Sequence, residues 1–216
     1  MHHDGRHLAG RQVGSRAATT ATICLLAIAF VGLWEHAMVT LASTLVATAL
    51  TLTLGIALGI ASFRSERYGR LQRPFLDAAQ TMPAFVYLLP ALALFGATRF
   101  TAIVAAIIYA APSVIRLVED GLRGVPAGPV EAARSAGATE RQLLWKVQLP
   151  IARPSLLLAA NQGIVLVLAM VVVGGLVGGG GLGYDVVEGF SQRADFGKGL
   201  AAGVALVLLG VMLDRI

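Results

Sequence analysis

The stretch "EAARSAGATERQLLWKVQLP", residues 131–150, is polar and helix-forming in a chain that is otherwise mostly apolar. It carries five charged side chains in twenty residues, whereas charged residues make up 13% and hydrophobic residues 56% of all 216. Soluble domains usually carry about 25% charged residues, and the mean hydropathy here is +0.76. The apolar residues come in blocks of about 20, enough to cross a bilayer core of about 30 Å. The sequence therefore predicts an all-α polytopic membrane protein with a polar insertion.

Six expected membrane spans sort the basic residues onto one side. The tail before the first span, the segment 63–74 and the loop 121–153 hold most of the arginines, and the opposite side holds only Arg99, Arg193 and Lys198. Because cytoplasmic loops of membrane proteins are enriched in Lys and Arg, both termini and the loop 121–153 are predicted to be cytoplasmic, in a plasma (inner) membrane. The same reasoning assigns the net charge of +5 to loops near lipid rather than to nucleic acid. The spans are residues 17–34, 41–62, 76–96, 101–119, 155–177 and 198–214.

The N-terminal region is predicted to be a cytoplasmic tail, residues 1–16, followed by an extra transmembrane helix, residues 17–34. His2, His3 and His7 allow metal binding by the tail, but a disordered tail is our expectation, and no metal site is assigned. No Ala-x-Ala-like cleavage site follows soon after, so a cleaved signal peptide is not predicted. Cys24 lies inside an apolar block and is expected to be a small apolar filler.

The polar insertion is predicted to form two short helices that meet at an elbow. The first, near 129–136, has Pro129 at a first helical position and Gly137 as a left-handed cap just past its end. The second, near 140–147, begins with a capping box of Thr139 and Gln142 and is ended by Leu149-Pro150. An elbow this short cannot bury its own apolar face. It packs either on the ends of its own spans or on a separate soluble protein, and the helix pattern alone leaves both open.

The spacing of the elbow residues resembles the EAA loop of ABC importer permeases, E-A-A-x3-G-x9-I-x-L-P, with Val147 in place of the isoleucine. The resemblance implies a type I (MetI-like) permease domain over residues 40–216. It also implies that the elbow is a coupling helix that docks on a separate ABC ATPase subunit. The small Ala132 and Ala133 would allow close approach, and Gly137 the sharp turn. The docking residues implied are Glu131, Ala132, Ala133, Gly137, Val147, Leu149 and Pro150.

Residues 76–90, residues 161–183 and the ending "LDRI" are similar to permeases of glycine betaine/proline importers. This resemblance implies a permease homodimer, an extracytoplasmic solute-binding protein, and compatible solutes such as glycine betaine, proline betaine or proline. The loop 97–100 looks short for that family, and the chain ends directly after the sixth expected span, so a regulatory C-terminal tail is not expected. Permeases of other importer subfamilies, for choline or carnitine, remain an alternative.

The chain is not predicted to be an enzyme or to hold a cofactor. It has no Walker A motif, and its only lysines are Lys146 and Lys198, so ATP and Mg²⁺ are expected on the partner ATPase. No His, Cys or carboxylate cluster indicates a catalytic site. A secondary transporter without an ATPase is a further alternative, but such proteins generally carry membrane-embedded charges. Here the charges Asp77, Arg116, Glu119 and Asp120 fall near span ends, where anchoring and loop contacts are expected.

The candidate translocation pathway consists of polar, aromatic and proline positions inside the spans. Asn161 and Gln162 lie about two turns into the fifth span, where they either hydrogen-bond between helices or line the path. The third span is predicted to be bent or broken by Pro83 and Pro90. In the second span, a stripe of hydroxyls indicates either close helix packing or a path lining. The stripe is Thr40, Ser43, Thr44, Thr48 and Thr51, and the pathway candidates are Pro83, Phe85, Tyr87, Asn161 and Gln162.

The glycine run "GGGGLG", residues 178–183, matches G-x-G-x-x-G, but a membrane span precedes it instead of a strand. A dinucleotide site needs a βαβ unit, so that reading is rejected. Consecutive glycines end the fifth span near its expected outer mouth. They are predicted to form either part of an external gate or a loose loop. The gate candidates are Gly178, Gly179, Gly180 and Gly181.

Overall fold

The computed structural model describes residues 18–191 and 196–215, and within these ranges every regular element is helical. The predicted all-α class is therefore confirmed, while the expected tail, residues 1–16, lies outside the described residues. The elements η1 and η2 are π-helical turns. The elements are a first helix, Ala18–Phe30, followed by α2 (Trp34–Arg64), α3 (Glu66–Thr81), α4 (Ala84–Phe95), α5 (Arg99–Arg123), α6 (Ala127–Ser135), α7 (Glu140–Gln142), η1 (Leu143–Gln148), α8 (Leu149–Ile151), α9 (Arg153–Gly174), η2 (Gly175–Gly179), α10 (Leu182–Ser191) and α11 (Phe196–Arg215).

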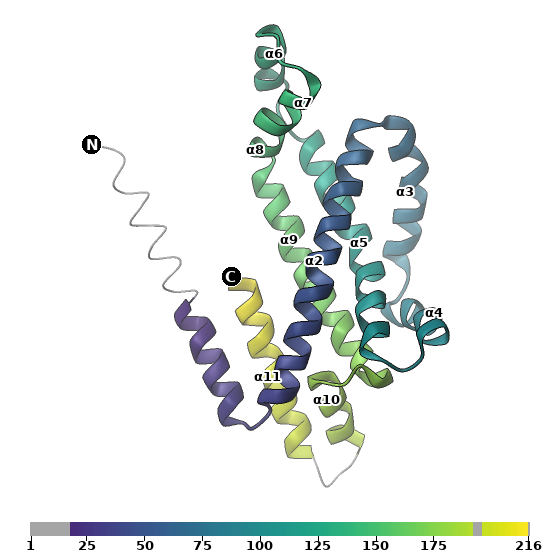
Figure 1. Cartoon of the computed structure of the whole chain (residues 1–216), viewed down its shortest axis with the longest axis vertical. Coiled ribbons are helices and arrows are strands. Elements are labelled where there is room, and N and C mark those ends of the chain that lie inside the picture. The colour runs from purple at the N-terminus through teal and green to yellow at the C-terminus, as the bar shows by residue number, and fades with distance from the viewer. Residues whose placement is uncertain (1–17, 192–195, 216) are drawn as a thin grey trace, which may run out of the picture.

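Three long helices, α2, α5 and α9, form the centre of the bundle (Figure 1). The hairpin of α3 and α4 lies on one side of them, and α11 with the first helix lies on the other. The short helices α6 and α7 project from one end of the bundle, which we call the elbow end. The turn η2 and helix α10 lie at the opposite end, which we call the glycine end. The helices α2, α5 and α9 run between these two ends.

Four helices in the described ranges are long and apolar enough to cross a membrane: α2, α5, α9 with η2, and α11. The pair α3 and α4 makes a fifth only if it is counted as one span bent by 100°. The first helix is apolar but shorter than 18 residues. It matches the start of the expected span 17–34, but α2 begins at Trp34, seven residues before the start expected at Leu41. The expected boundary between the first two spans was therefore wrong.

The predicted break in the third span occurs at Pro83 alone. Met82 and Pro83 both adopt extended backbone conformations, which separate α3 from α4. Pro90 lies inside α4 without interrupting it, so the break falls at Pro83 and not at Pro90. The segment 63–74, expected as a loop, is largely the first half of α3. Ser65 caps that helix by accepting a hydrogen bond from the Tyr68 amide.

Basic residues gather at the elbow end, as the alternation of spans predicted. Arg64 ends α2, Arg123 ends α5 and Arg153 begins α9, and all three termini lie at that end. At the glycine end, Arg99 begins α5 and Lys198 lies in the first turn of α11. Glu119 of α5 is buried and accepts hydrogen bonds from Arg73 (3.0 Å) and Arg123 (2.9 Å). This ion pair ties α3 to α5.

Small residues let α2 and α5 approach closely. A Cβ placed on Gly55 would lie 2.5 Å from Val114, and one on Gly59 would lie 2.7 Å from Val118. The hydroxyl stripe follows the same helix: Thr44 and Thr51 are fully buried, with no hydrogen-bond partner among the described residues for their hydroxyls. Membrane helices associate through such close packing, because lipid gives no hydrophobic drive between them. The packing reading of the stripe is therefore favoured over a path lining.

We expect Gly59→Ala to lower the free energy of unfolding by about 1–3 kcal/mol. The new Cβ would lie 2.8 Å from the Val118 Cβ and 2.9 Å from the backbone oxygen of Ile115, which cannot easily move. Gly203→Ala in α11 is the matched control, since a Cβ there meets nothing within 4 Å. It should be neutral or stabilise by up to about 1 kcal/mol, because alanine is the better helix former. Thermal unfolding in detergent measures both, and equal melting temperatures would contradict the close contact.

A buried carboxylate joins three helices at the glycine end. Asp185 of α10 has no exposed surface, and its Oδ2 pairs with Nδ1 of His36 near the start of α2. Lys198 Nζ of α11 forms an ion pair with Oδ1 at 3.0 Å. The Leu182 amide also donates to Thr40 Oγ1 at 2.9 Å. These contacts fix the start of α10 to α2.

Replacing both His36 and Lys198 should destabilise the protein more than replacing Asp185. His36→Leu with Lys198→Met leaves Asp185 buried without its two described partners, which we expect to cost about 3–5 kcal/mol. Asp185→Asn leaves His36 and Lys198, whose side chains are 43% and 41% exposed and can be hydrated. Asp185→Asn should therefore lower the free energy of unfolding by a smaller amount. Thermal unfolding of the three proteins in one detergent gives the order, and the reverse order would refute this account of the cluster.

Candidate functional site

The elbow begins with α6, whose start lies two residues earlier than predicted. Pro126 is the residue before the helix, with ψ of 141°, and Ala127 is the first helical residue. Pro129 is therefore the third helical residue, not the first. It is still tolerated, because amides of the first turn have no partner within the helix. Sequence alone did not distinguish the two prolines as starting points.

Gly137 ends α6 in the predicted left-handed conformation, with φ of +84°. The Ala138 amide donates to the Ala133 carbonyl (3.1 Å) and the Gly137 amide to that of Arg134 (3.0 Å). This is the hydrogen-bond pattern of a Schellman cap. A Cβ at Gly137 would meet nothing within 4 Å, so the position requires glycine for its backbone angle and not for lack of space.

The second arm of the elbow starts with the predicted capping box. The Thr139 amide donates to Gln142 Oε1 at 2.8 Å, and the Gln142 amide donates to Thr139 Oγ1 at 3.4 Å. Arg134 Nη2 lies 3.0 Å from Glu140 Oε1 and links the two arms. Both side chains of that pair are more than half exposed, so the pair orients the arms but adds little stability.

The second arm does not end at Leu149-Pro150, and that prediction was wrong. The chain continues through η1 and α8 toward α9, and Gln148, Leu149 and Ala152 all keep helical backbone angles. Within η1 the Leu149 amide bonds the Leu144 carbonyl, five residues back. This wider turn accommodates Pro150, which lacks an amide and would clash in a regular α-helix. The elbow therefore joins the last core helix directly.

The tip of the elbow is free of the bundle, whereas its root is fixed to it. No residue of α6 or α7 is buried, and the two project from the end of the molecule (Figure 1). Leu143 and Leu144 are buried, and Leu144 belongs to a cluster with Val118 and Leu122 of α5. Of the two alternatives left open by the sequence, packing on the protein's own spans thus applies to η1 but not to α6. Glu131, Ala132, Gly137 and Pro150 are exposed, and Ala133, Val147 and Leu149 are half-buried.

Trp145 is an exposed elbow residue that sequence reasoning did not assign to the site. Its side chain is 61% exposed within η1, while its neighbours Leu143 and Leu144 point into the bundle. An exposed tryptophan beside small residues is typical of a contact that a partner protein buries. The sequence did contain a signal for this position: Trp145 lies in a polar loop, where a tryptophan does not serve as a lipid anchor.

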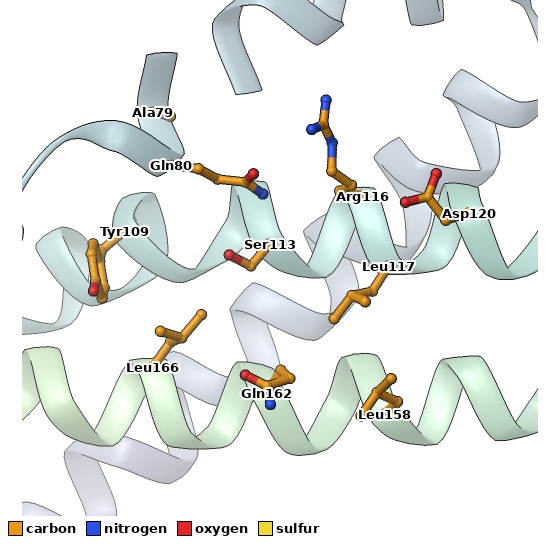
Figure 2. A pocket seen from close by; sticks show the side chains of 10 residues that line it. All are labelled: Ala79, Gln80, Tyr109, Ser113, Arg116, Leu117, Asp120, Leu158, Gln162 and Leu166. Atoms are coloured by element: carbon orange, nitrogen blue, oxygen red, sulfur yellow. The ribbon is translucent and has the colours of Figure 1, made fainter. Parts of the chain in front are cut away.

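A cavity of about 560 Å³ lies between α3, α5 and α9 toward the elbow end. Figure 2 shows its lining, in which Leu117 points from α5 toward α9, whereas Arg116 and Asp120 point to the side of Gln80. The α5 positions are spaced by three and four residues and so share one helical face. That polar periodicity was visible in the sequence but was not recognised. The lining is Ala79, Gln80, Tyr109, Ser113, Arg116, Leu117, Asp120, Leu158, Gln162 and Leu166.

The structure brings some of the predicted pathway residues to this cavity and separates others. Gln162 lines it, whereas the neighbouring Asn161 is half-buried and is not part of the lining. Tyr87 packs edge-to-face on the lining residue Tyr109, with ring centres 5.6 Å apart, and donates to the Ala79 carbonyl. Phe85 is 56% exposed and does not line this cavity. Pro83 lies at the break between α3 and α4.

The glycine run is a packed turn. Gly178, Gly180 and Gly181 have positive φ (93°, 68° and 74°). A Cβ on Gly178 would lie 2.8 Å from the Ala97 backbone oxygen, and one on Gly181 would lie 2.5 Å from Thr40 Oγ1. Gly179 is buried within η2. These contacts contradict a loose loop. The external gate, with Gly178, Gly179, Gly180 and Gly181 as its residues, stays a prediction.

Comparison with known proteins agrees with this geometry. Residues 51–216 match the family model described as a binding-protein-dependent transport system inner membrane component. The chain belongs to this family. It is 45% identical over 204 residues to the glycine betaine/proline betaine transport system permease protein ProW of Escherichia coli, covering 94% of this chain. It is 41% identical over 194 residues to the glycine betaine transport system permease protein OpuAB of Bacillus subtilis, covering 90% of this chain.

The fold is that of a solved importer permease. An inward-facing structure of the MetNI methionine ABC transporter matches with a TM-score of 0.75 and 26% identity, covering 84% of this chain and 91% of that one. The predicted MetI-like architecture is therefore confirmed. The chain spans 57% of the length of the Escherichia coli relative and 68% of the Bacillus subtilis one.

Proposed function

We propose that the chain is the transmembrane permease subunit of an ATP-driven importer that takes up glycine betaine, proline betaine or a related compatible solute. The observation that carries this proposal is the elbow, whose tip leaves the residues of the EAA pattern uncovered while its root is packed into the bundle. Such a surface needs a partner to cover it. The solute class is inferred from the relatives, which are named as permeases for glycine betaine and proline betaine.

The elbow would transmit work from a separate ATPase to the spans. Glu131, Ala132, Ala133 and Gly137 lie on α6 and its cap, where a groove on the ATPase would hold them. Because η1 and α8 continue helically toward α9, a displacement of α6 is carried into the bundle and not absorbed by a flexible loop. We infer that ATP-driven closure of two ATPase subunits moves the elbows of two permease copies, and that the spans then change between inward-open and outward-open states.

In this proposal the elbow end is cytoplasmic and the glycine end faces outward. The basic residues at the ends of α2 and α5 and at the start of α9 support that orientation, because Lys and Arg favour the cytoplasmic side. A binding protein would deliver solute at the glycine end, and the cavity near Gln162 would be part of the route toward the elbow end. ATP and Mg²⁺ belong to the ATPase, and this chain supplies the passage.

Gly137→Asp should abolish ATP-dependent uptake and binding of the ATPase without removing the protein from the membrane. An added side chain would stand on the surface that the ATPase covers. Gly96→Asp is a close control, because Gly96 also has positive φ (+70°, against +84°) and no heavy atom within 4 Å of a Cβ, but follows α4 at a distance from the elbow. Gly96 also has ψ of −173°, a conformation that side chains adopt even less readily, so the control carries at least as much backbone strain as Gly137→Asp and differs in its location.

Co-purification with the ATPase and uptake into proteoliposomes measure the effect. Gly96→Asp should keep ATPase binding near the wild-type level, and Gly137→Asp should lose it. Adding Glu131→Arg to Gly137→Asp should leave no detectable complex. If Gly137→Asp retains both the ATPase and full transport, the elbow is not the coupling surface.

Gln162→Leu should lower the rate of uptake more than Asn161→Leu does. Gln162 lines the cavity and Asn161 does not, so only the first change removes a polar group from the proposed route. Both replacements are amide to leucine at adjacent positions of α9, which matches their chemistry. Uptake is divided by the amount of assembled permease–ATPase complex. Equal losses per complex, or a larger loss for Asn161→Leu, would show that the route does not run along this face.

A further inference from the structure

Two side chains of opposite charge lie one helical turn apart on the cavity wall without pairing with each other. Arg116 and Asp120 both line the cavity, and Figure 2 shows them on neighbouring turns of α5, on the side where Gln80 of α3 lies. Residues four apart on a helix normally form an ion pair when their charges are opposite. Here Arg116 Nη2 instead lies 2.6 Å from Asp77 Oδ1 of α3. The opposite charges are therefore held apart.

Asp120 has no cation partner among the described residues, although a second arginine is close in the sequence. Arg123, three residues along, is held by the buried Glu119 at 2.9 Å. Arg73 of α3 is held by the same carboxylate at 3.0 Å. The nearby arginines are thus occupied by other carboxylates, and Asp120 is an exposed residue that lines the cavity without an ion-pair partner among the described residues.

Asp120 also borders a second cavity, of about 270 Å³, at the root of the elbow. That cavity is lined by Gly124 and Val125, which precede α6, and by Ile151 and Ala152, which precede α9. Leu117, Asp120 and Leu158 belong to both linings. A solute that moves from the larger cavity toward the elbow end therefore passes Asp120.

The wall suits a molecule that carries both charges. A cation beside Asp120 would be attracted by its carboxylate, and an anion beside Arg116 would share the guanidinium with Asp77. A small zwitterion can place its cation near Asp120 and its carboxylate near Arg116, whose guanidinium has five N–H donors and is bound to Asp77 through one nitrogen. The cavity of about 560 Å³ falls within the range of small-molecule sites, about 300–1,000 Å³.

We propose that Arg116 and Asp120 form a binding site for the transported zwitterion, with the quaternary ammonium at Asp120 and the carboxylate at Arg116. This inference rests on the proposed function, which supplies the solute class. Asp77 is a positioning residue in it, because it draws the guanidinium away from Asp120 and keeps the two charges separate. The pair is a determinant of solute selection that acts inside the membrane subunit.

The test uses the complete importer, with its ATPase and binding protein, in proteoliposomes. Asp120→Asn removes the charge and nearly keeps the shape, and Asp120→Glu keeps the charge. Asp214→Asn is the matched control, because Asp214 is an exposed carboxylate near the end of α11 and lines neither cavity. Radiolabelled glycine betaine uptake and ATP hydrolysis stimulated by the loaded binding protein are measured on the same vesicles.

Asp120→Asn should lower uptake of glycine betaine per ATP hydrolysed by about tenfold, the effect of losing one favourable charge contact. Stimulated ATP hydrolysis should persist, since the elbow is intact. Asp120→Glu should recover most of the uptake, and Asp214→Asn should match the wild type. A structural role for Asp120 would instead reduce ATP hydrolysis and uptake together in Asp120→Asn, and that result would overturn the proposal.

If Asp120→Asn takes up as much glycine betaine as Asp214→Asn, the proposed Arg116–Asp120 site is also refuted. The proposed importer function is not affected by that result. If the wild-type importer takes up no glycine betaine with its own binding protein, the proposed function fails first. Arg116→Gln adds a check on the anionic end. It should reduce discrimination between glycine betaine and choline, which has the quaternary ammonium but no carboxylate, and unchanged discrimination would contradict the assignment of the carboxylate to Arg116.

Discussion

The close approach of α2 and α5 at Gly55 and Gly59 is the contact on which the rest of the structure depends. In lipid, apolar side chains gain nothing by leaving one apolar surface for another, so helices associate where small residues allow their backbones to meet. Val114 and Val118 fill the space above the two glycines, which fixes the rotation of α5 about its axis. That rotation turns the face with Tyr109, Ser113, Arg116 and Asp120 toward the cavity. It also presents Val118 and Leu122 to the root of the elbow.

The break at Pro83 and the turns η2 and η1 are irregular in backbone conformation. Each lies where packing or the elbow can accommodate it. Non-helical groups are tolerated at membrane depth only against protein or a water-lined space. The break at Pro83 lies beside the cavity wall, because Ala79 and Gln80 just before it line that cavity. The turn η2 packs on α5 and α10 at the glycine end. The turn η1 lies at the elbow root, where it allows Pro150 to remain in a helical path. Each place is also a point at which a helix changes direction or partner.

Sequence patterns predicted the parts of the fold that depend on local chemistry. Gly137, the Thr139 capping box and the Pro83 break follow from backbone rules that act over a few residues, and each was found. The errors concern choices made by tertiary contacts. Pro90 leaves α4 intact and Pro150 leaves the chain helical, because the surrounding turns adapt. Helix α10 was not predicted, because a distant contact holds it in place: its buried Asp185 pairs with His36, 149 residues away. The polar side chains of α5 that line the cavity were not recognised for the same reason: they form a cavity wall only because α9 packs beside α5.

The two ends of the molecule are built for different tasks by the same helices. At the glycine end, Asp185 ties α10 to α2 through His36 and to α11 through Lys198, and Gly178 and Gly181 have no space for a side chain. At the elbow end, α6 is held only through η1 and the capped turn, so its surface is available while its root is buried. A force on α6 therefore reaches α5 through Leu144 and α9 through α8. These two helices form the facing walls of the cavity. Relative movement of α5 and α9 changes the separation of Asp120 from Leu158 and Gln162. The proposed coupling surface and the proposed solute site are in this way consecutive parts of one mechanical path.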